Sequence, residues 1–136
     1  MKVESATKSV LVVEDEQSIR DVLVELFETE GNVVTAAELL PDALDRLRSQ
    51  KFDLIVTDLR LGGKRDGGLQ VMALAGMLSP DATVLVLTAY PDDSNRQASF
   101  RLGALHFLEK PVDLAVIAQH ANACGVKTAF ATSAKD

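Results

Sequence analysis

Three short runs of almost uninterrupted aliphatic residues constrain the fold of this 136-residue chain more than any other feature. The runs occupy residues 10–13 (VLVV), 54–56 (LIV) and 84–87 (VLVL). A strand with apolar side chains on both sides must be covered on both faces, as a central strand is in a parallel sheet packed between helices. We therefore expect an α/β fold with a buried parallel sheet.

Segments of helical periodicity alternate with these strands and with two weaker strand patterns at residues 33–36 and 106–108. The expected helices are a segment that turns Ile19, Val22, Leu23, Leu26 and Phe27 inward and ends near Gly31, a segment that begins near Pro41 and turns Ala43, Leu44 and Leu47 inward, and residues 69–78, 92–102 and 112–124. Strict alternation with right-handed crossovers predicts a flavodoxin-like (βα)5 fold, a doubly wound parallel sheet of five strands in the order 2-1-3-4-5.

The length of the chain suits one domain. We expect residues 1–8 to be an N-terminal extension, residues 9–125 to be the domain, and residues 126–136 to be a C-terminal tail or linker stub.

The net charge of -6 argues against direct nucleic-acid binding, because an acidic surface repels the phosphate backbone. No apolar run approaches the length of a membrane helix, and a single cysteine, Cys124, fits a reducing compartment. We expect a cytoplasmic protein.

The residues that follow the strands carry the chemistry. Acidic residues Glu14 and Asp15 follow the first strand, Asp58 the third, Thr88 the fourth and Lys110 the fifth. All carboxyl ends of a parallel sheet lie at one edge, and in the order 2-1-3-4-5 the first and third strands are neighbours at the topological switch point. Glu14, Asp15 and Asp58 should therefore meet in one crevice.

Carboxylates gathered in one crevice repel one another unless a cation neutralises them. Oxygen ligands of this kind suit Mg²⁺, which keeps water in its remaining positions. Lys110 would add a positive charge on the far side. A carboxylate, a hydroxyl, an ammonium group and Mg²⁺ around one point suit phosphoryl transfer to a carboxylate, where the protein mainly positions groups and neutralises charge.

Four motifs in order and in register carry a family resemblance. They are VLVVEDE at 10–16, LIVTDLRL at 54–61, VLVLTAY at 84–90 and FLEKPV at 107–112. Together they span about residues 9–124, and with them the chain resembles the receiver domain of two-component response regulators. The resemblance implies that Asp58 is the phosphoacceptor. It also implies an Mg²⁺ site in which Asp15 binds directly, Glu14 binds largely through water, and Asp58 and the backbone carbonyl of Arg60 supply further ligands.

The resemblance also assigns residues to the phosphorylated state. Thr88 matches the hydroxyl that closes on a phosphoryl oxygen, and Lys110 matches the lysine that pairs with the phosphoryl group. Ala89 matches a small position that leaves the acceptor accessible. Phe107 matches an aromatic switch position, although an aromatic there also suits the core. The Lys110–Pro111 bond is expected to be cis.

The resemblance implies a phosphorylation switch rather than a conventional enzyme. A histidine kinase or a histidine phosphotransfer protein would donate the phosphoryl group from a phosphohistidine. The signal would pass to a protein effector or a fused output domain, with a homodimer through the helix 4, strand 5 and helix 5 face as a further possibility. Residues 114–126 carry no charged side chain, so this part of the surface is either an Ala-rich exposed face or one covered by a partner or second copy.

One segment departs from the family pattern. The loop at 61–68 reads LGGKRDGG; it lacks the usual proline and has one extra residue, so we expect it to be longer and more mobile. Arg60 places a long cation two residues after Asp58, where it would either touch the phosphoryl group or shield it from water. His106 and His120 lack metal-ligand partners at useful spacing.

Two other functions fit parts of this pattern. An Mg²⁺-dependent phosphohydrolase with an aspartyl intermediate would need a second acidic group two residues after the nucleophile, where Arg60 stands. A pseudo-receiver would keep the fold as a protein-binding scaffold without the chemistry. The intact set of Asp15, Asp58, Thr88 and Lys110 argues against a pseudo-receiver.

Overall fold

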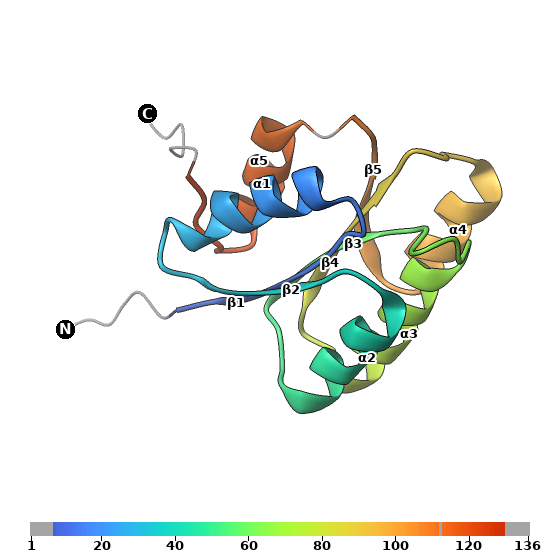
Figure 1. Ribbon diagram of the computed structural model, residues 1–136, viewed down its shortest axis with the longest axis horizontal. Helices are drawn as coiled ribbons and strands as arrows, with labels where there is room; N and C mark the ends of the chain where they lie inside the picture. The colour runs from blue at the N-terminus through green and yellow to red at the C-terminus, as the bar shows by residue number, and fades with distance from the viewer. Residues whose placement is uncertain (1–6, 112, 130–136) are drawn as a thin grey trace.

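Five parallel strands form one sheet in the order β2-β1-β3-β4-β5 (Figure 1). The strands are β1 (Ser9–Val13), β2 (Val33–Ala37), β3 (Leu54–Asp58), β4 (Thr83–Thr88) and β5 (Ala104–Glu109). This computed structural model describes residues 7–111 and 113–129. The expected strand order and the flavodoxin-like architecture are confirmed. Parts of the expected N-terminal extension (1–6) and tail (130–136), together with Val112, lie outside the described residues.

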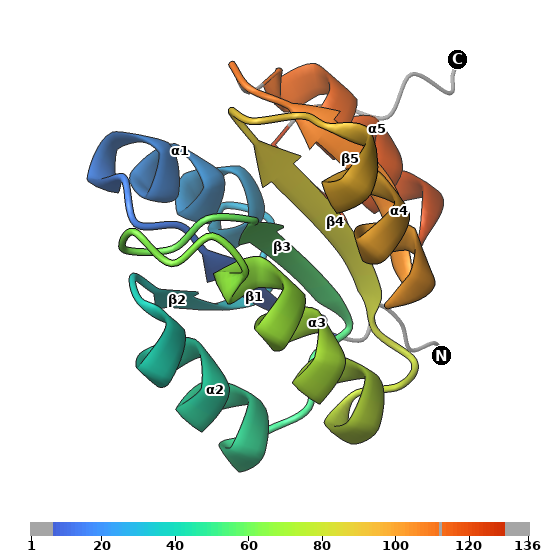
Figure 2. The same cartoon turned by 90° about the vertical axis from the view of Figure 1, so that its right-hand side faces the viewer.

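Helices cover both faces of the sheet. They are α1 (Gln17–Glu28), α2 (Leu40–Ser49), α3 (Gly67–Leu78), α4 (Asp93–Arg101) and α5 (Leu114–Ala123). The helices α1 and α5 lie on one face and α2, α3 and α4 on the other (Figure 1). Figure 2 shows α2 beside α3 and α4 beside β5. No helix in the described part of the chain is both long and apolar enough to cross a membrane.

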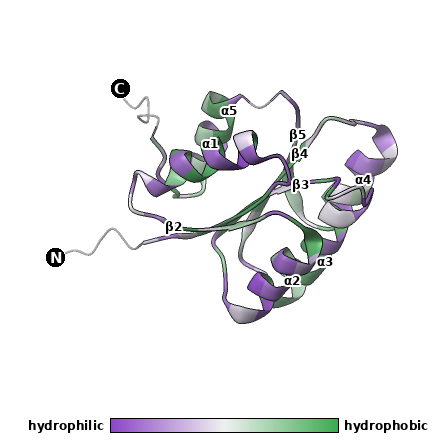
Figure 3. Cartoon of the chain, viewed as in Figure 1, coloured by the Kyte–Doolittle hydropathy of each residue, from purple (hydrophilic) through white to green (hydrophobic). Residues whose placement is uncertain are grey.

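Two cores form because the central strands are apolar on both sides. Leu11 and Val13 face the core under α2 and α3, whereas Val10 and Val12 face the core under α1 and α5. These four side chains are almost completely buried, as the aliphatic run at 10–13 predicts. Figure 3 shows hydrophobic residues on much of α3 and α5, whereas α2 and α4 carry more hydrophilic ones.

Some local expectations were wrong, each for a physical reason. Val22 was expected inward but is 42% exposed, because the inward stripe of α1 centres on Leu23, Leu26 and Phe27 and Val22 lies at its edge. The fifth helix begins at Leu114 rather than at residue 112. Asp113 is its N-cap, and the Asp113 carboxylate accepts a hydrogen bond from the Ala115 N–H at 3.0 Å.

The two histidines meet although they are far apart in sequence. His106 of β5 and His120 of α5 stack with 3.6 Å between ring centroids and 23° between ring planes. Burial, and secondarily the neighbouring His106, lowers the pKa of His120 below its ordinary value. The pair thus joins β5 to α5 as a structural contact.

Two glycines at the start of α3 allow this helix to lie against the end of β3. The Gly68 N–H donates a hydrogen bond to the Leu59 carbonyl at 2.8 Å. A Cβ atom at Gly68 would lie 2.4 Å from the Asp58 carbonyl oxygen and 2.7 Å from the Leu59 Cα. At Gly67, a Cβ atom would lie 2.9 Å from the Leu61 Cβ. The backbone that carries Asp58 is therefore packed directly against α3.

We predict that Gly68→Ala destabilises the fold by about 3 kcal/mol, because the added methyl group would meet backbone atoms that cannot move aside. Gly76→Ala is the matched control, because Gly76 lies in the same helix, is exposed, and would have no atom within 4 Å of an added methyl group. The control should gain about 0.5–1 kcal/mol from its helix propensity. Urea unfolding of both variants measures the difference, and equal stabilities would contradict this packing.

Candidate functional site

The predicted site residues lie together at the carboxyl edge of the sheet. Glu14 and Asp15 directly follow β1, Asp58 ends β3, Thr88 ends β4, and Lys110 directly follows β5. Parallel pairing aligns β3 with β1 on one side and with β4 on the other, so strand ends that are distant in sequence become neighbours. The polar residues at the ends of β1, β3 and β4 reach this edge because the strand before each of them is anchored by buried aliphatic side chains.

Three carboxylates form an acidic cluster. Glu14, Asp15 and Asp58 each contribute an oxygen, and these oxygens lie within 4.8 Å of one another. Among the described residues, this is the group of side chains that could hold a metal ion. Glu14 is fully buried, Asp58 is 6% exposed, and Asp15 is half-buried. Glu14 and Asp58 are therefore shielded from solvent, and solvent reaches the cluster from the side of Asp15.

Lys110 forms an ion pair with two of these carboxylates. The Lys110 Nζ lies 2.9 Å from the Asp58 Oδ2, 3.0 Å from the Glu14 Oε1 and 3.2 Å from the Glu14 Oε2. Burial alone would lower the pKa of Lys110, but the hydrogen bonds to Asp58 and Glu14 outweigh it and raise the pKa. Lys110 therefore remains an ammonium group at neutral pH.

Among the carboxyl groups of the cluster, Glu14 has a clearly raised pKa. Burial, and next the charge of Asp58, raises the pKa of Glu14 to about 7, against the opposing effects of Lys110 and of the Glu16 N–H. That N–H donates to the Glu14 Oε2 at 3.1 Å. One ammonium group thus leaves the repulsion among three carboxylates incompletely neutralised. An all-oxygen cluster with residual negative charge fits a hard divalent cation such as Mg²⁺.

Thr88 lies buried beside this cluster and is 1% exposed. Its Oγ1 accepts a hydrogen bond from the Tyr90 N–H at 2.9 Å, and its carbonyl accepts one from the Lys110 N–H at 2.7 Å. Because the hydroxyl is an acceptor in this bond, its own proton remains available for donation. The peptide bond between Lys110 and Pro111 is cis, as expected.

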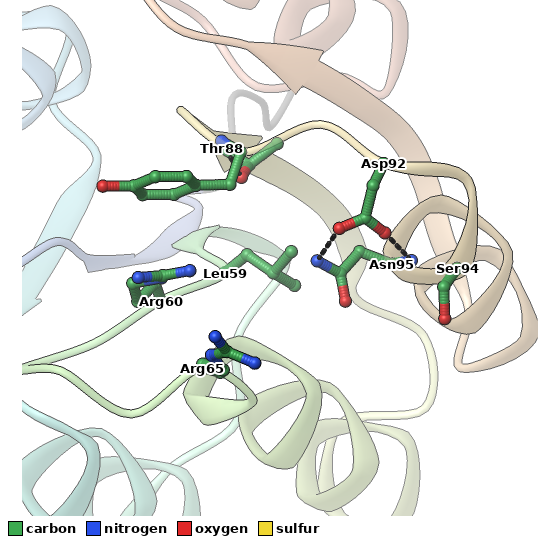
Figure 4. A pocket seen from close by; sticks show the side chains of 8 residues that line it. Leu59, Arg60, Arg65, Thr88, Asp92, Ser94 and Asn95 are labelled. Carbon is green, nitrogen blue, oxygen red and sulfur yellow. Dashed lines mark hydrogen bonds between the residues drawn. The ribbon is translucent and has the colours of Figure 1, made fainter.

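Two adjacent cavities open at this edge. One, of about 240 Å³, is called the Asp58 cavity and is lined by Asp15, Glu16, Asp58, Arg60, Gly63, Ala89, Tyr90 and Lys110. The other, of about 400 Å³, is lined by Leu59, Arg60, Arg65, Thr88, Tyr90, Asp92, Ser94 and Asn95. Figure 4 shows this second cavity, with Arg60 and Arg65 on one side and Asp92, Ser94 and Asn95 on the other. Arg60 and Tyr90 line both cavities and so stand between them.

Arg60 contacts an aromatic ring that sequence reasoning did not connect with it. The Arg60 Cζ lies 3.9 Å from the centroid of the Tyr90 ring, within the range of a cation–π contact. The contact joins the loop after β3 to the loop after β4, and no spacing in the sequence signals it. The side chain of Arg60 therefore lies at the rim of the Asp58 cavity.

Phe107 of β5 is half-buried, and its side chain contacts residues of α4. Its ring lies 6.5 Å from that of Phe100, and the Arg96 Cζ lies 5.3 Å from the Phe107 ring centroid. Phe107 packs against the core under α2 and α3, so it combines a core contact with a position near the surface. Phe107 therefore contacts both the core and α4, and its role as a switch stays a prediction.

The unusual loop after β3 contains an ordered turn. Leu61 and Lys64 form an antiparallel bridge, in which each N–H donates to the carbonyl of the other at 3.0 and 2.9 Å. The Gly62 N–H donates to the Asp15 Oδ2 at 3.0 Å. The turn and its contact with the acidic cluster were not predicted from the sequence.

Comparisons with known proteins agree on one family. Residues 10–122 match the sequence profile of the response regulator receiver domain. The chain is 30% identical over 107 residues to sporulation initiation phosphotransferase F of Bacillus subtilis, covering 79% of this chain and 85% of that protein. It is 34% identical over 105 residues to the transcriptional regulatory protein YvrH of the same species, covering 76% of this chain. The chain spans 43% of the length of YvrH.

Solved structures show the same likeness. A response regulator protein from Burkholderia pseudomallei, solved with a phosphorylated aspartic acid, calcium ion and citrate, is 34% identical with a TM-score of 0.74, covering 81% of this chain and 64% of that one. The beryllofluoride-activated NtrC4 receiver domain dimer is 30% identical with a TM-score of 0.76, covering 87% and 96%. A CheY-like receiver domain from Methanospirillum hungatei, 24% identical with a TM-score of 0.80 over 87% and 93% of the two chains, shares the fold.

The raised pKa of Glu14 predicts a pH dependence of stability in the presence of EDTA. Between the ordinary value of 4.5 and about 7 the folded protein keeps a proton on Glu14 that the unfolded chain has lost, so stability falls as the pH rises through this window. The free energy of unfolding of the wild type minus that of Glu14→Gln should therefore decrease between pH 4.5 and 7.5, by at most about 3 kcal/mol. Urea unfolding across this range measures it, and a constant difference would contradict the shift.

Proposed function

This chain belongs to the response regulator receiver domain family, and we propose that it is a phosphorylation switch in which Asp58 accepts the phosphoryl group. The observation that carries the proposal is the Lys110 ammonium 2.9 Å from the Asp58 carboxylate, inside a cluster of carboxylates that suits a divalent cation. An acceptor for a dianionic phosphoryl group needs positive charge of this kind around it.

In the proposed reaction an Asp58 oxygen attacks the phosphorus of a phosphohistidine on a histidine kinase or histidine phosphotransfer protein. The new P–O bond forms as the P–N bond breaks, and the imidazole leaves with the electron pair. Lys110 stabilises one of the equatorial oxygens, and the Thr88 hydroxyl donates its free proton to another. Ala89, the small residue after Thr88, leaves the approach to Asp58 open.

We propose that Mg²⁺ is the cofactor. Asp15 and Asp58 would bind it directly, Glu14 largely through water, and the backbone carbonyl of Arg60 would supply a further ligand. When bound, the cation neutralises the acidic cluster and the charge of the transferred group. The half-buried position of Asp15 supports an entry path for the cation from the solvent side.

The switch follows from new charge at Asp58. The phosphoryl group would draw the Thr88 hydroxyl toward it, and Phe107 would move into the space beside Thr88. Phe107 contacts Phe100 of α4, so its movement would alter the face formed by α4, β5 and α5. We propose that this face binds a protein effector, a fused output domain or a second copy of the chain, in the cytoplasm and without direct contact with nucleic acid or membrane.

A conventional phosphohydrolase is a poorer fit. Position 60, two residues after Asp58, carries an arginine whose side chain lies on Tyr90 and offers no acid or base for turnover. We therefore propose that any hydrolysis is the slow self-dephosphorylation of the switch. A pseudo-receiver scaffold is the alternative that the following experiment separates from the switch.

Incubation with Mg²⁺ and acetyl phosphate should add one phosphoryl group, seen as a gain in intact-protein mass. The gain should be absent in Asp58→Asn and in the wild type with EDTA, because the first lacks the nucleophile and the second lacks the cation. Circular dichroism of each sample shows that the protein is folded. A folded wild type that gains no mass under any condition would favour the scaffold.

The lifetime of the phosphorylated state should depend on Arg60. Arg60→Ala removes a side chain from the rim of the Asp58 cavity, so water reaches the acyl phosphate more easily and hydrolysis should be several-fold faster. Arg65→Ala is the matched control, because Arg65 lines the neighbouring cavity and not the Asp58 cavity. Loss of phosphorylated mass over time, after removal of the donor, measures both rates. Equal rates in the two variants would contradict the shielding role.

A further inference from the structure

The turn at Leu61–Lys64 has the geometry of a two-residue hairpin. Gly62 and Gly63 occupy its central positions with φ of 55° and 84°, a left-handed conformation that glycine adopts without a steric penalty. The bridge between Leu61 and Lys64 closes it with two hydrogen bonds. The paired glycines of this loop thus fit a defined turn, which is called here the glycine hairpin.

The glycine hairpin binds the acidic cluster through one hydrogen bond. The Gly62 N–H donates to the Asp15 Oδ2 at 3.0 Å. Within residues 7–111 and 113–129, no other group donates a hydrogen bond to the Asp15 carboxylate. A carboxylate has two oxygens with several lone pairs, so this bond leaves Asp15 able to bind a cation.

Buried contacts fix the glycine hairpin in place. Leu61 is 1% exposed and belongs to the core under α2 and α3, next to Gly67. On the other side, the turn touches the side chain of Leu39, which is 46% exposed, so the buried Leu61 and the Leu61–Lys64 bridge are what hold the turn. The amide of Gly62 is therefore held by the fold rather than by the carboxylate alone.

We propose that Gly62 is a positioning residue for the divalent cation, and this inference rests on the proposed function. Asp15 is half-buried, and repulsion from Glu14 and Asp58 favours its rotation outward into water. The Gly62 amide opposes that rotation and keeps the Asp15 carboxylate facing the cluster before the cation arrives. Residues that orient a ligand in this way typically change metal affinity ten- to a hundredfold when they are altered.

Two backbone variants test this role. Replacing Gly62 by glycolic acid exchanges its N–H for an ester oxygen, which cannot donate to Asp15, and leaves every side chain unchanged. This variant should bind Mg²⁺ about tenfold more weakly than the wild type. The same replacement at Gly63 is the matched control, because the Gly63 N–H donates no hydrogen bond to the Asp15 carboxylate. The control should keep an affinity near that of the wild type.

The single tyrosine of this chain, which has no tryptophan, supplies the measurement. Tyr90 lines the same cavity as Asp15, so Mg²⁺ can be titrated against Tyr90 fluorescence at constant ionic strength, without any phosphorylation. Urea unfolding of each variant identifies loss of affinity that comes from unfolding. Isothermal titration calorimetry with MgCl₂ gives the affinity independently of the fluorophore.

The outcomes separate this inference from the proposed function. If the wild type binds Mg²⁺ and the ester at position 62 binds it as tightly as the ester at position 63 does, the positioning role is wrong and the proposed function stands. Equal weakening by both esters would also overturn it, because the change of backbone chemistry alone would then explain the loss. If the folded wild type binds no Mg²⁺ at millimolar concentration, the inference and the proposed cofactor fall together.

Discussion

The ion pair of Lys110 with Asp58 and Glu14 is the interaction on which the rest of the site depends. A buried carboxylate without a partner costs several kcal/mol, and here two of them lie within 3.2 Å of one ammonium group. Lys110 makes it possible to bury Asp58 at the end of a central strand. Even with Lys110 beside it, Glu14 has a pKa of about 7. The negative charge of the cluster is therefore incompletely neutralised, and a further cation would stabilise it. The same incomplete neutralisation that limits the stability of the fold suits the cluster to a divalent cation.

The sheet brings the site residues together because each lies at the end of a strand, and the apolar residues of these strands pack in the two cores. Parallel pairing of β1, β3 and β4 requires no contact between the polar residues themselves. Gly68 adds a constraint from the opposite side, since it allows α3 to pack on the backbone of Asp58. The glycine hairpin, which precedes α3, reaches back to Asp15. A strand and a helix hold Asp58, while loops supply Arg60 and Tyr90 at the rim of its cavity.

Much of this arrangement could be predicted from the sequence. The aliphatic runs and the strict alternation of strand and helix were enough for the order of the strands, because buried parallel strands have few alternatives. The meeting of Glu14, Asp15 and Asp58 followed from that order alone. Helix ends were less predictable, since the Asp113 cap is a single side-chain hydrogen bond that competes weakly with the apolar pattern around it.

Contacts between loops could not be predicted. The stacking of Arg60 on Tyr90 and the bond from Gly62 to Asp15 each join segments whose separation in sequence carries no periodic signal. They depend on how far each loop reaches once the sheet has formed. The sequence analysis expected a longer, more mobile loop at 61–68 and did not identify the closed turn that its two adjacent glycines favour.

The central claim is that Asp58, and no other carboxylate of the cluster, becomes the acyl phosphate. Borohydride reduction of the protein treated with a phosphodonor converts a phosphorylated aspartate to homoserine, which peptide mass mapping then locates. We expect homoserine at position 58, and only in the sample that contained Mg²⁺. Homoserine at another position, or none in a folded sample that had gained mass, would contradict the account.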